Sequence, residues 1–132
     1  MDVELVKGKD WRIFHRYLTD DEMSMIENSD GPVDCFFEVW TIREAFAKEE
    51  GLGLKILDRD FLVNYDRLEI DYDGRRLYFK SFDYDAGDKY KISVCSEYDV
   101  SKASIHILSP EEWDKLWSGL AISDKQETYV DG

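Results

Sequence analysis

The chain has 132 residues, of which 43% are hydrophobic and 14% aromatic, so it is long enough and apolar enough to bury the core of a single domain. Its 30 acidic residues against 17 basic ones give a net charge of −13, which argues against direct binding of nucleic acid or of an anionic membrane surface. The two cysteines, Cys35 and Cys95, have no spacing that suggests zinc, a redox pair or a disulfide framework.

Short strands are predicted at the N-terminal end. Val3 and Leu5 alternate with acids, and residues 11–18 alternate in a similar way, which favours one or two strands around a turn at Gly8. This end has no basic region followed by an apolar one, and no apolar run in the chain has the length needed to cross a bilayer. The sequence therefore predicts a cytoplasmic protein.

Two helices are expected next. Thr19 and Glu22 have the spacing of a capping box, with acids in the first turn, and predict the start of a short helix. Residues 33–50 fit two structures: one long helix, or a strand over residues 33–40 that leads into a shorter helix. The long helix is preferred because no turn residue interrupts the segment. A connector with one short strand at residues 54–57 follows.

The strongest local signal in the sequence is a β-hairpin turn at Asp73-Gly74. Both central residues of a type I′ turn need positive φ, and Asp followed by Gly meets that requirement. The register that follows pairs Ile70 with Leu77 on an apolar face. These two strands are the centre of the predicted sheet.

A second reversal is predicted at residues 85–88, where the sequence reads Asp-Ala-Gly-Asp. A four-residue loop there places Phe79 opposite Val94 and Ser81 opposite Ile92. With the preceding hairpin, this gives an antiparallel meander of three strands.

The chain is predicted to end with a strand, a helix and a loose tail. Residues 103–108 alternate in polarity, and Ser109 with Glu112 again has the spacing of a capping box. Residues 123–132 lack periodicity and are expected to form a loose acidic tail. The predicted fold is one α+β domain over residues 1–122: an antiparallel β-meander of about four to five strands packed by two to three helices.

No motif predicts a catalytic residue, a metal ligand or a cofactor. Asp83, Asp85 and Asp88 are closely spaced, but an EF-hand loop needs Gly at its sixth position and Glu at its twelfth, so an acidic turn is expected instead. Histidine can serve as a general base, but no nucleophile motif, phosphate-binding loop or metal signature accompanies His106. Because the chain has 30 acids, no single pair of carboxylates is informative.

The polar face and the turns of the meander are the predicted partner-binding surface. Tyrosine beside carboxylate is the composition expected of an interface that meets Lys and Arg. The residues predicted to contact a partner are Asp71, Asp73, Tyr78, Asp83, Tyr84, Asp85 and Asp88. The alternative is that a second layer of helix covers this face.

Charge, size and the lack of catalytic signatures favour a protein that is not an enzyme. The leading hypothesis is a small cytosolic inhibitor or immunity-type protein that blocks a basic partner such as a nuclease toxin. One alternative is a phage-type nucleic-acid mimic that inhibits a host defence nuclease of anti-CRISPR or anti-restriction type. Another is a small enzyme or ligand-binding domain with His106, His15 or Cys95 in a pocket. A homodimer formed by edge pairing is also compatible with the strands.

Overall fold

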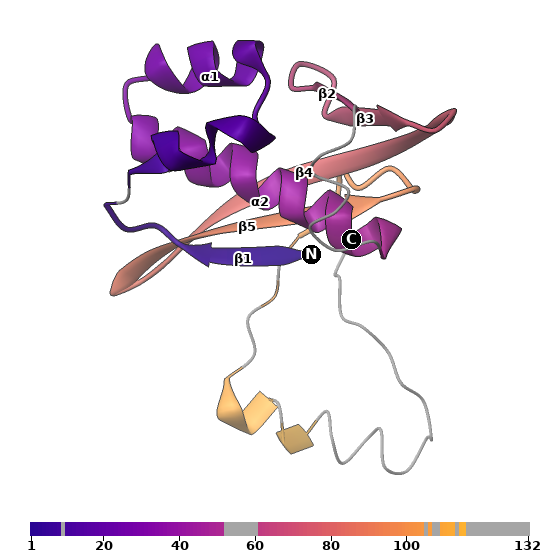
Figure 1. The fold of residues 1–132 in the computed structure, drawn as a ribbon. Helices are drawn as coiled ribbons and strands as arrows, with labels where there is room; N and C mark the ends of the chain where they lie inside the picture. Colours follow the sequence, from indigo (N-terminus) through magenta and orange to yellow (C-terminus); the bar gives the residue numbers. More distant parts are fainter. Residues whose placement is uncertain (9, 52–60, 105, 107–108, 113, 116–132) are drawn as a thin grey trace. The chain divides into compact units, whose positions relative to one another are not determined.

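A computed structural model describes residues 1–8, 10–51, 61–104, 106, 109–112 and 114–115 (Figure 1). The chain divides into two compact units, Met1–Ser101 and Lys102–Gly132, and the sheet belongs to the first. Among the described residues, no helix is both long enough and apolar enough to cross a membrane.

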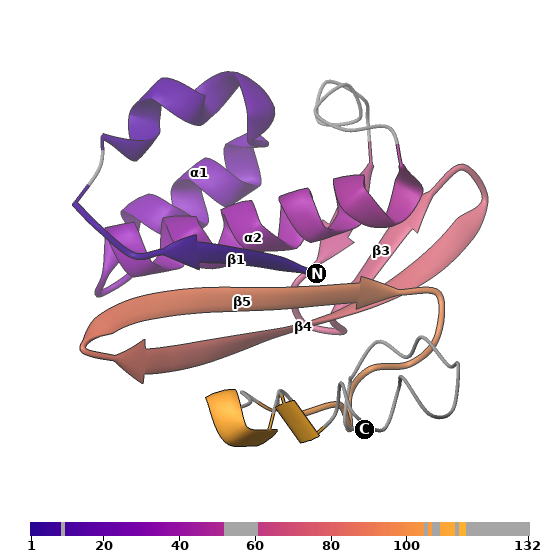
Figure 2. The ribbon, with the colours of Figure 1, turned by 90° about the horizontal axis from the view of Figure 1, so that it is seen from below.

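Five antiparallel strands form one sheet in the spatial order β1-β5-β4-β3-β2 (Figure 2). They are β1 (Asp2–Leu5), β2 (Leu62–Asn64), β3 (Glu69–Tyr72), β4 (Arg75–Ala86) and β5 (Asp88–Ser96). The last four follow one another as a meander, and β1 pairs with the free edge of β5. The prediction of an α+β fold with a meander is therefore confirmed.

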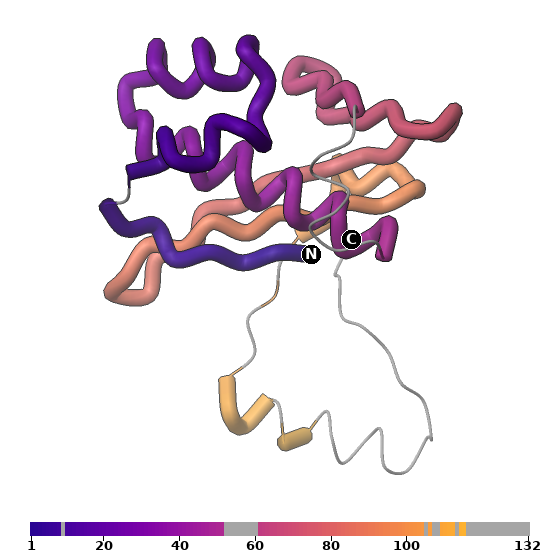
Figure 3. Tube along the Cα trace, viewed as in Figure 1, coloured from indigo at the N-terminus to yellow at the C-terminus, as the bar shows by residue number. Residues whose placement is uncertain are grey.

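Three helical segments accompany the sheet: the 3₁₀ helix η1 (Trp11–Tyr17), α1 (Asp20–Glu27) and α2 (Pro32–Glu50). The long α2 lies across one face of the sheet, and α1 packs against α2 (Figures 1 and 3). The preference for a single long helix is confirmed, with Gly51 at its C-terminal end in the left-handed region at φ 71°. The capping box at Thr19 and Glu22 is also confirmed, because each backbone N–H donates to the other residue's side chain.

The predicted strand over residues 11–18 is wrong. Trp11, Phe14 and Tyr17 are three residues apart, which is the repeat of a 3₁₀ helix, and their rings share one face. The Trp11 ring centroid lies 6.3 Å from that of Phe36, and those of Phe14 and Tyr17 lie 4.9 and 6.0 Å from that of Trp40. Aromatic packing on α2 therefore selects the three-residue period over the two-residue period.

The β3–β4 hairpin has the predicted register. Asp73 and Gly74 have φ values of 51° and 73°, as a type I′ turn requires. Ile70 pairs with Leu77, and both side chains are buried. The turn chemistry and the apolar pattern agree at this point.

The predicted register of β4 and β5 is wrong by one residue. Phe79 pairs with Cys95 and not with Val94, because the chain reverses tightly at Gly87, whose φ is 85°. A shift of one residue moves every side chain of a strand to the other face of the sheet. Ser93 and Cys95 therefore share the α2-covered face with Phe79, and Val94 lies on the opposite face.

Several predicted elements lie outside the described residues. These are the strand at residues 54–57, half of the strand at 103–108 and the tail at 123–132. The last helix is described only as far as residue 115, but its capping box is present: the Glu112 backbone N–H donates to Ser109 Oγ over 3.2 Å. The domain boundary at residue 122 stays a prediction.

Candidate functional site

Three carboxylates meet between the edge strand β1 and helix α2. Asp2 and Glu4 are two residues apart on β1, so their side chains point to the same face of the sheet. Glu44 projects from α2, and one carboxylate oxygen from each of the three residues lies within 4.8 Å of the other two. Residues from distant parts of the chain thus form one acidic cluster.

Lys48 lies beside this cluster, one helical turn after Glu44. Its Nζ donates a hydrogen bond to Asp2 Oδ1 over 2.7 Å. This hydrogen bond, together with the charge of Asp2, raises the pKa of Lys48, so the ammonium stays charged. Lys48 thus meets a cluster of three carboxyl groups.

In β1 an acidic side chain is buried and an apolar side chain is exposed, which is the reverse of the usual arrangement. Asp2 is 3% exposed, whereas the neighbouring Val3 is 48% exposed. Asp2 Oδ2 is buried, and no hydrogen bond to it forms within the described part of the chain. A buried carboxylate oxygen without a donor is costly, and it therefore indicates a place for a positively charged ligand.

Glu44 has an unusual proton affinity. Burial raises its pKa from 4.5 to about 7, with further contributions from the charges of Asp2 and Glu4. When Glu44 is neutral, its proton can be shared with Asp2, and this contact also favours the protonated form. Crowded carboxylates of this kind suit a hard divalent cation, because Mg²⁺, Mn²⁺ and Ca²⁺ take oxygen ligands. The donor set fits such a cation.

Buried hydroxyl groups connect α2 to the strand next to β1. Thr41 and Ser93 are fully buried, and their Oγ atoms are 2.7 Å apart. Ser93 also lies 2.8 Å from the hydroxyl oxygen of Ser81 and is the register partner of Asp2. The helix that carries Glu44 is therefore tied to the strand pair that carries Asp2.

The residues predicted to bind a partner form two groups along β4. Asp71, Asp73 and Tyr78 lie at the β3–β4 end, where Arg76 Nε donates to Asp71 Oδ1 over 3.1 Å. Tyr78 is the register partner of Glu69. Tyr78 is five residue steps from Asp83 along β4, or about 17 Å of extended strand, so this group is separate from the next.

The second group lies at the β4–β5 turn and comprises Asp83, Tyr84, Asp85 and Asp88. Asp83 forms an ion pair with Lys91 at 2.5 Å, and Asp85 and Asp88 are exposed. The structure thus does not gather the seven residues into one patch. Partner binding at these positions stays a prediction.

The histidines and Cys95 have local roles. Cys95 is part of the core, and burial raises the pKa of its thiol to about 12. His15 Nδ1 lies 3.0 Å from the Arg12 carbonyl oxygen on the exposed side of η1. His106 Nε2 lies 2.9 Å from Glu112 Oε2, and both side chains are about half exposed. Each histidine thus has a surface contact.

A comparison with known protein families decides the class of the chain. The sequence model of the 4′-phosphopantetheinyl transferase superfamily matches residues 1–102, which include all five strands, α2 and the acidic cluster. The chain belongs to this superfamily. The match ends before His106, so it lends no support to a role for that residue.

Individual relatives carry the same description. The 4′-phosphopantetheinyl transferase Sfp of Bacillus subtilis strain 168 is 28% identical over 119 residues, which are 85% of this chain and 52% of the relative. The 4′-phosphopantetheinyl transferase gsp of Aneurinibacillus migulanus is 24% identical over 129 residues, which are 94% of this chain and 54% of the relative. The chain spans about half the length of these relatives.

These findings correct the functional hypotheses drawn from the sequence. The prediction of an inhibitor or immunity protein that is not an enzyme is wrong, because the chain belongs to a family of transferases. The expected basic nuclease partner and the nucleic-acid mimic are wrong for the same reason.

Sequence reasoning missed Asp2, Glu4, Glu44 and Lys48. Two signals were present: an Asp-x-Glu pair on one face of a strand, and Glu and Lys at i, i+4 on one face of a helix. Neither signal stands out in a chain with 30 acids. The alternation of Val3 and Leu5 with acids predicted a strand without assigning its buried face, and the structure buries Asp2 and exposes Val3.

Proposed function

We propose that this chain supplies the metal-binding part of a 4′-phosphopantetheinyl transferase, which moves the phosphopantetheinyl group of coenzyme A to a carrier protein. The observation that carries the proposal is the cluster of Asp2, Glu4 and Glu44 beside Lys48, all within the matched residues. The chain spans about half the length of each of these relatives.

Asp2, Glu4 and Glu44 would hold a divalent cation such as Mg²⁺. When bound, such a cation neutralises phosphate oxygens and stabilises the charge that develops during phosphoryl transfer. Asp2 and Glu4 are fixed by the pairing of β1 with β5, and Glu44 is fixed by the position of α2. The backbone of a strand and a helix thus holds the three carboxylates of the proposed site in position without a bound cation.

Lys48 is suited to contact the donor's phosphate groups. Its side chain is 57% exposed, so the ammonium can turn from Asp2 toward a bound phosphate. The raised pKa of Lys48 keeps it protonated near neutral pH. It therefore supplies positive charge and hydrogen bonds to the transition state rather than acting as a base.

The exposed side of η1 is suited to an acidic acceptor protein. On a chain of net charge −13, residues 7–18 hold four basic residues, at positions 7, 9, 12 and 16, and one acid, at position 10. Arg12, His15 and Arg16 are exposed there, and Ile13 is 62% exposed. Positive charge around an apolar side chain favours docking of an acidic surface.

Metal binding and transfer test the proposal directly. We expect Mn²⁺, followed by electron paramagnetic resonance, to bind the wild-type chain and to bind Glu44→Gln at least about tenfold more weakly. Glu49→Gln removes an exposed acid from the same helix and should leave the affinity unchanged. Transfer of labelled phosphopantetheine from coenzyme A should need a divalent cation and be lost in Glu44→Gln. Equal Mn²⁺ binding by wild type and Glu44→Gln would contradict the proposal.

A further inference from the structure

A second polar cluster is buried on another side of α2, next to the residue that would bind metal. Arg43 precedes Glu44, and its Nε donates to both carboxylate oxygens of Glu22 over 3.0 Å. Arg43 Nη2 also contacts Glu22 Oε1. Both side chains are only 3% exposed. A buried ion pair therefore links α1 to α2 at the level of the acidic cluster.

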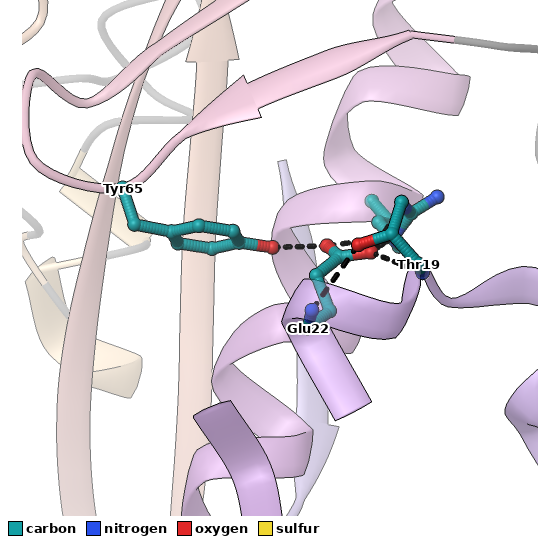
Figure 4. A network of polar contacts seen from close by, with 4 residues as sticks. Thr19, Glu22 and Tyr65 are labelled. Carbon is teal, nitrogen blue, oxygen red and sulfur yellow. Dashed lines mark hydrogen bonds and ion pairs between the residues drawn. The ribbon is translucent and has the colours of Figure 1, made fainter. Parts of the chain in front are cut away.

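Glu22 also accepts hydrogen bonds from the N-cap of its own helix and from the β2–β3 turn (Figure 4). The Thr19 backbone N–H donates to Glu22 Oε1 over 2.9 Å, and the Tyr65 hydroxyl donates to Glu22 Oε2. Figure 4 shows Tyr65 and Thr19 approaching Glu22 from opposite sides. Burial and the charge of Glu22 raise the pKa of Tyr65, so its hydroxyl stays a donor. We call Thr19, Glu22, Arg43 and Tyr65 the Glu22 clamp.

Stability alone does not explain why the Arg43–Glu22 ion pair is buried. Removing two charges from water is costly, and well-packed apolar side chains often serve stability as well as a buried ion pair. A forked arginine–carboxylate contact adds a fixed geometry, because the planar guanidinium meets the carboxylate in a defined orientation. The Phe61 ring, 4.6 Å from Arg43 Cζ, further restricts the guanidinium. These contacts therefore fix the position of the Arg43 guanidinium.

The clamp can fix the rotation of α2 about its own axis. Successive residues are about 100° apart around a helix, so Arg43 and Thr41 project on opposite sides, about 200° apart. Arg43 is held by Glu22, and Thr41 is held by Ser93. A carboxylate about 6 Å from the helix axis moves by about 1 Å when the helix turns by 10°. Metal–ligand distances tolerate only about 0.2 Å, so Glu44 needs this restraint.

We propose that the Glu22 clamp is a positioning device for the metal centre, in which Arg43 and Glu22 fix the rotation of α2 so that Glu44 meets Asp2 and Glu4. The inference rests on the proposed metal centre and adds residues that touch neither metal nor substrate. It differs from a purely structural role in one respect: loosening the clamp lowers the affinity for metal in protein that is still folded.

The test compares metal affinities of folded variants. Arg43→Lys keeps the charge and loses the fork, and Tyr65→Phe removes one donor to Glu22 while keeping the ring. Arg75→Lys is the matched control, because Arg75 also bridges to α2, through Glu50, in an exposed ion pair. Circular dichroism establishes that each variant is folded. Mn²⁺ and Ca²⁺ affinities are then measured for each.

We expect Arg43→Lys to bind Mn²⁺ about tenfold more weakly and Tyr65→Phe about threefold more weakly. The affinity for Ca²⁺ should change less, because Ca²⁺ accepts flexible geometry whereas small divalent cations need near-ideal octahedral sites. Arg75→Lys should match the wild type. If Arg43→Lys does not fold, Tyr65→Phe decides the question on the same measurement.

The outcomes separate this inference from the proposed function. Wild-type binding of Mn²⁺ with unchanged affinities in the folded clamp variants would overturn the positioning role and leave the metal centre standing. Equal losses of Mn²⁺ and Ca²⁺ affinity would show general loosening and would also overturn it. Failure of the wild-type chain to bind Mn²⁺ would overturn the metal centre and the clamp's role together.

Discussion

Replacing Glu44 by Gln should stabilise the metal-free protein at pH 8 while it removes metal binding. In the folded chain, burial and the charges of Asp2 and Glu4 raise the pKa of Glu44 from 4.5 to about 7. A carboxyl group whose pKa is higher in the folded than in the unfolded state lowers the free energy of unfolding wherever it is ionised. Gln has the same shape and no charge, so it removes this penalty.

The size of the effect follows from the two pKa values. The difference between 4.5 and about 7, at 1.36 kcal/mol for each pKa unit, corresponds to about 3 kcal/mol. The penalty is fully present above the folded pKa of about 7, decreases as the pH falls, and is absent below 4.5. Water screens a half-buried side chain, so we expect a measured gain of about 1 to 2 kcal/mol at pH 8.

Urea denaturation with a metal chelator at pH 8, 6 and 4.5 measures this gain. The difference between Glu44→Gln and wild type should be largest at pH 8 and vanish at pH 4.5. Glu49→Gln, which removes an exposed acid from the same helix, should show no such profile. Saturating Mn²⁺ should stabilise only the wild type. No gain at pH 8, or an equal gain at pH 4.5, would refute the reasoning.

Three further predictions concern the fold that supports the site. Gly74→Ala should lower the free energy of unfolding by about 1 kcal/mol, since Gly74 has a φ of 73°, and an unchanged urea midpoint would argue against a type I′ turn. Burial raises the pKa of Cys95 to about 12, so only about 10⁻⁴ of this thiol is ionised at pH 8. The half-buried Cys35 should therefore react first with a chromogenic thiol reagent. Equal rates for the two thiols would contradict the burial of Cys95. Thr41→Val removes a hydroxyl next to Ser93 and should cost about 1 to 2 kcal/mol in the same denaturation assay, whereas unchanged stability would mean that the Ser93 contact is not stabilising.

The elements that the sequence predicts well are those set by local chemistry. Asp73 and Gly74 determine a turn through their backbone preferences alone. Thr19 and Glu22 start α1 because their side chains satisfy each other's backbone donors. The long α2 has Pro32 in its first turn, a position that tolerates the missing N–H. None of these choices depends on distant residues.

The errors occur where distant packing decides between local alternatives. In β5, residues 92–95 are all buried, so their polarity does not indicate which side chains face α2. A tight reversal at Gly87 instead of a four-residue loop then shifts the whole strand. Over residues 11–17, the apolar pattern fits a period of two or of three, and packing against the aromatic rings of α2 decides.

The acidic cluster could not be predicted because its members come from separate elements. Asp2 and Glu4 lie on an edge strand, and Glu44 lies on a helix about forty residues later in the chain. Their meeting depends on β1 joining the far edge of β5, which no local pattern specifies. The alternation of polarity around Val3 supports a strand and leaves open which face is buried.

Two buried acids in this fold show how burial separates a structural carboxylate from a functional one. Glu22 and Asp2 are each 3% exposed, so both lose the stabilisation that water would provide. Glu22 regains it within the chain, from the fork of Arg43, the Tyr65 hydroxyl and a backbone N–H. Asp2 has Lys48 on one oxygen, no hydrogen bond to the other among the described residues, and two more carboxylates close by. A fold that satisfies one buried carboxylate fully and crowds another with like charge has an internal partner for the first, and this difference supports the proposed cation site at the second.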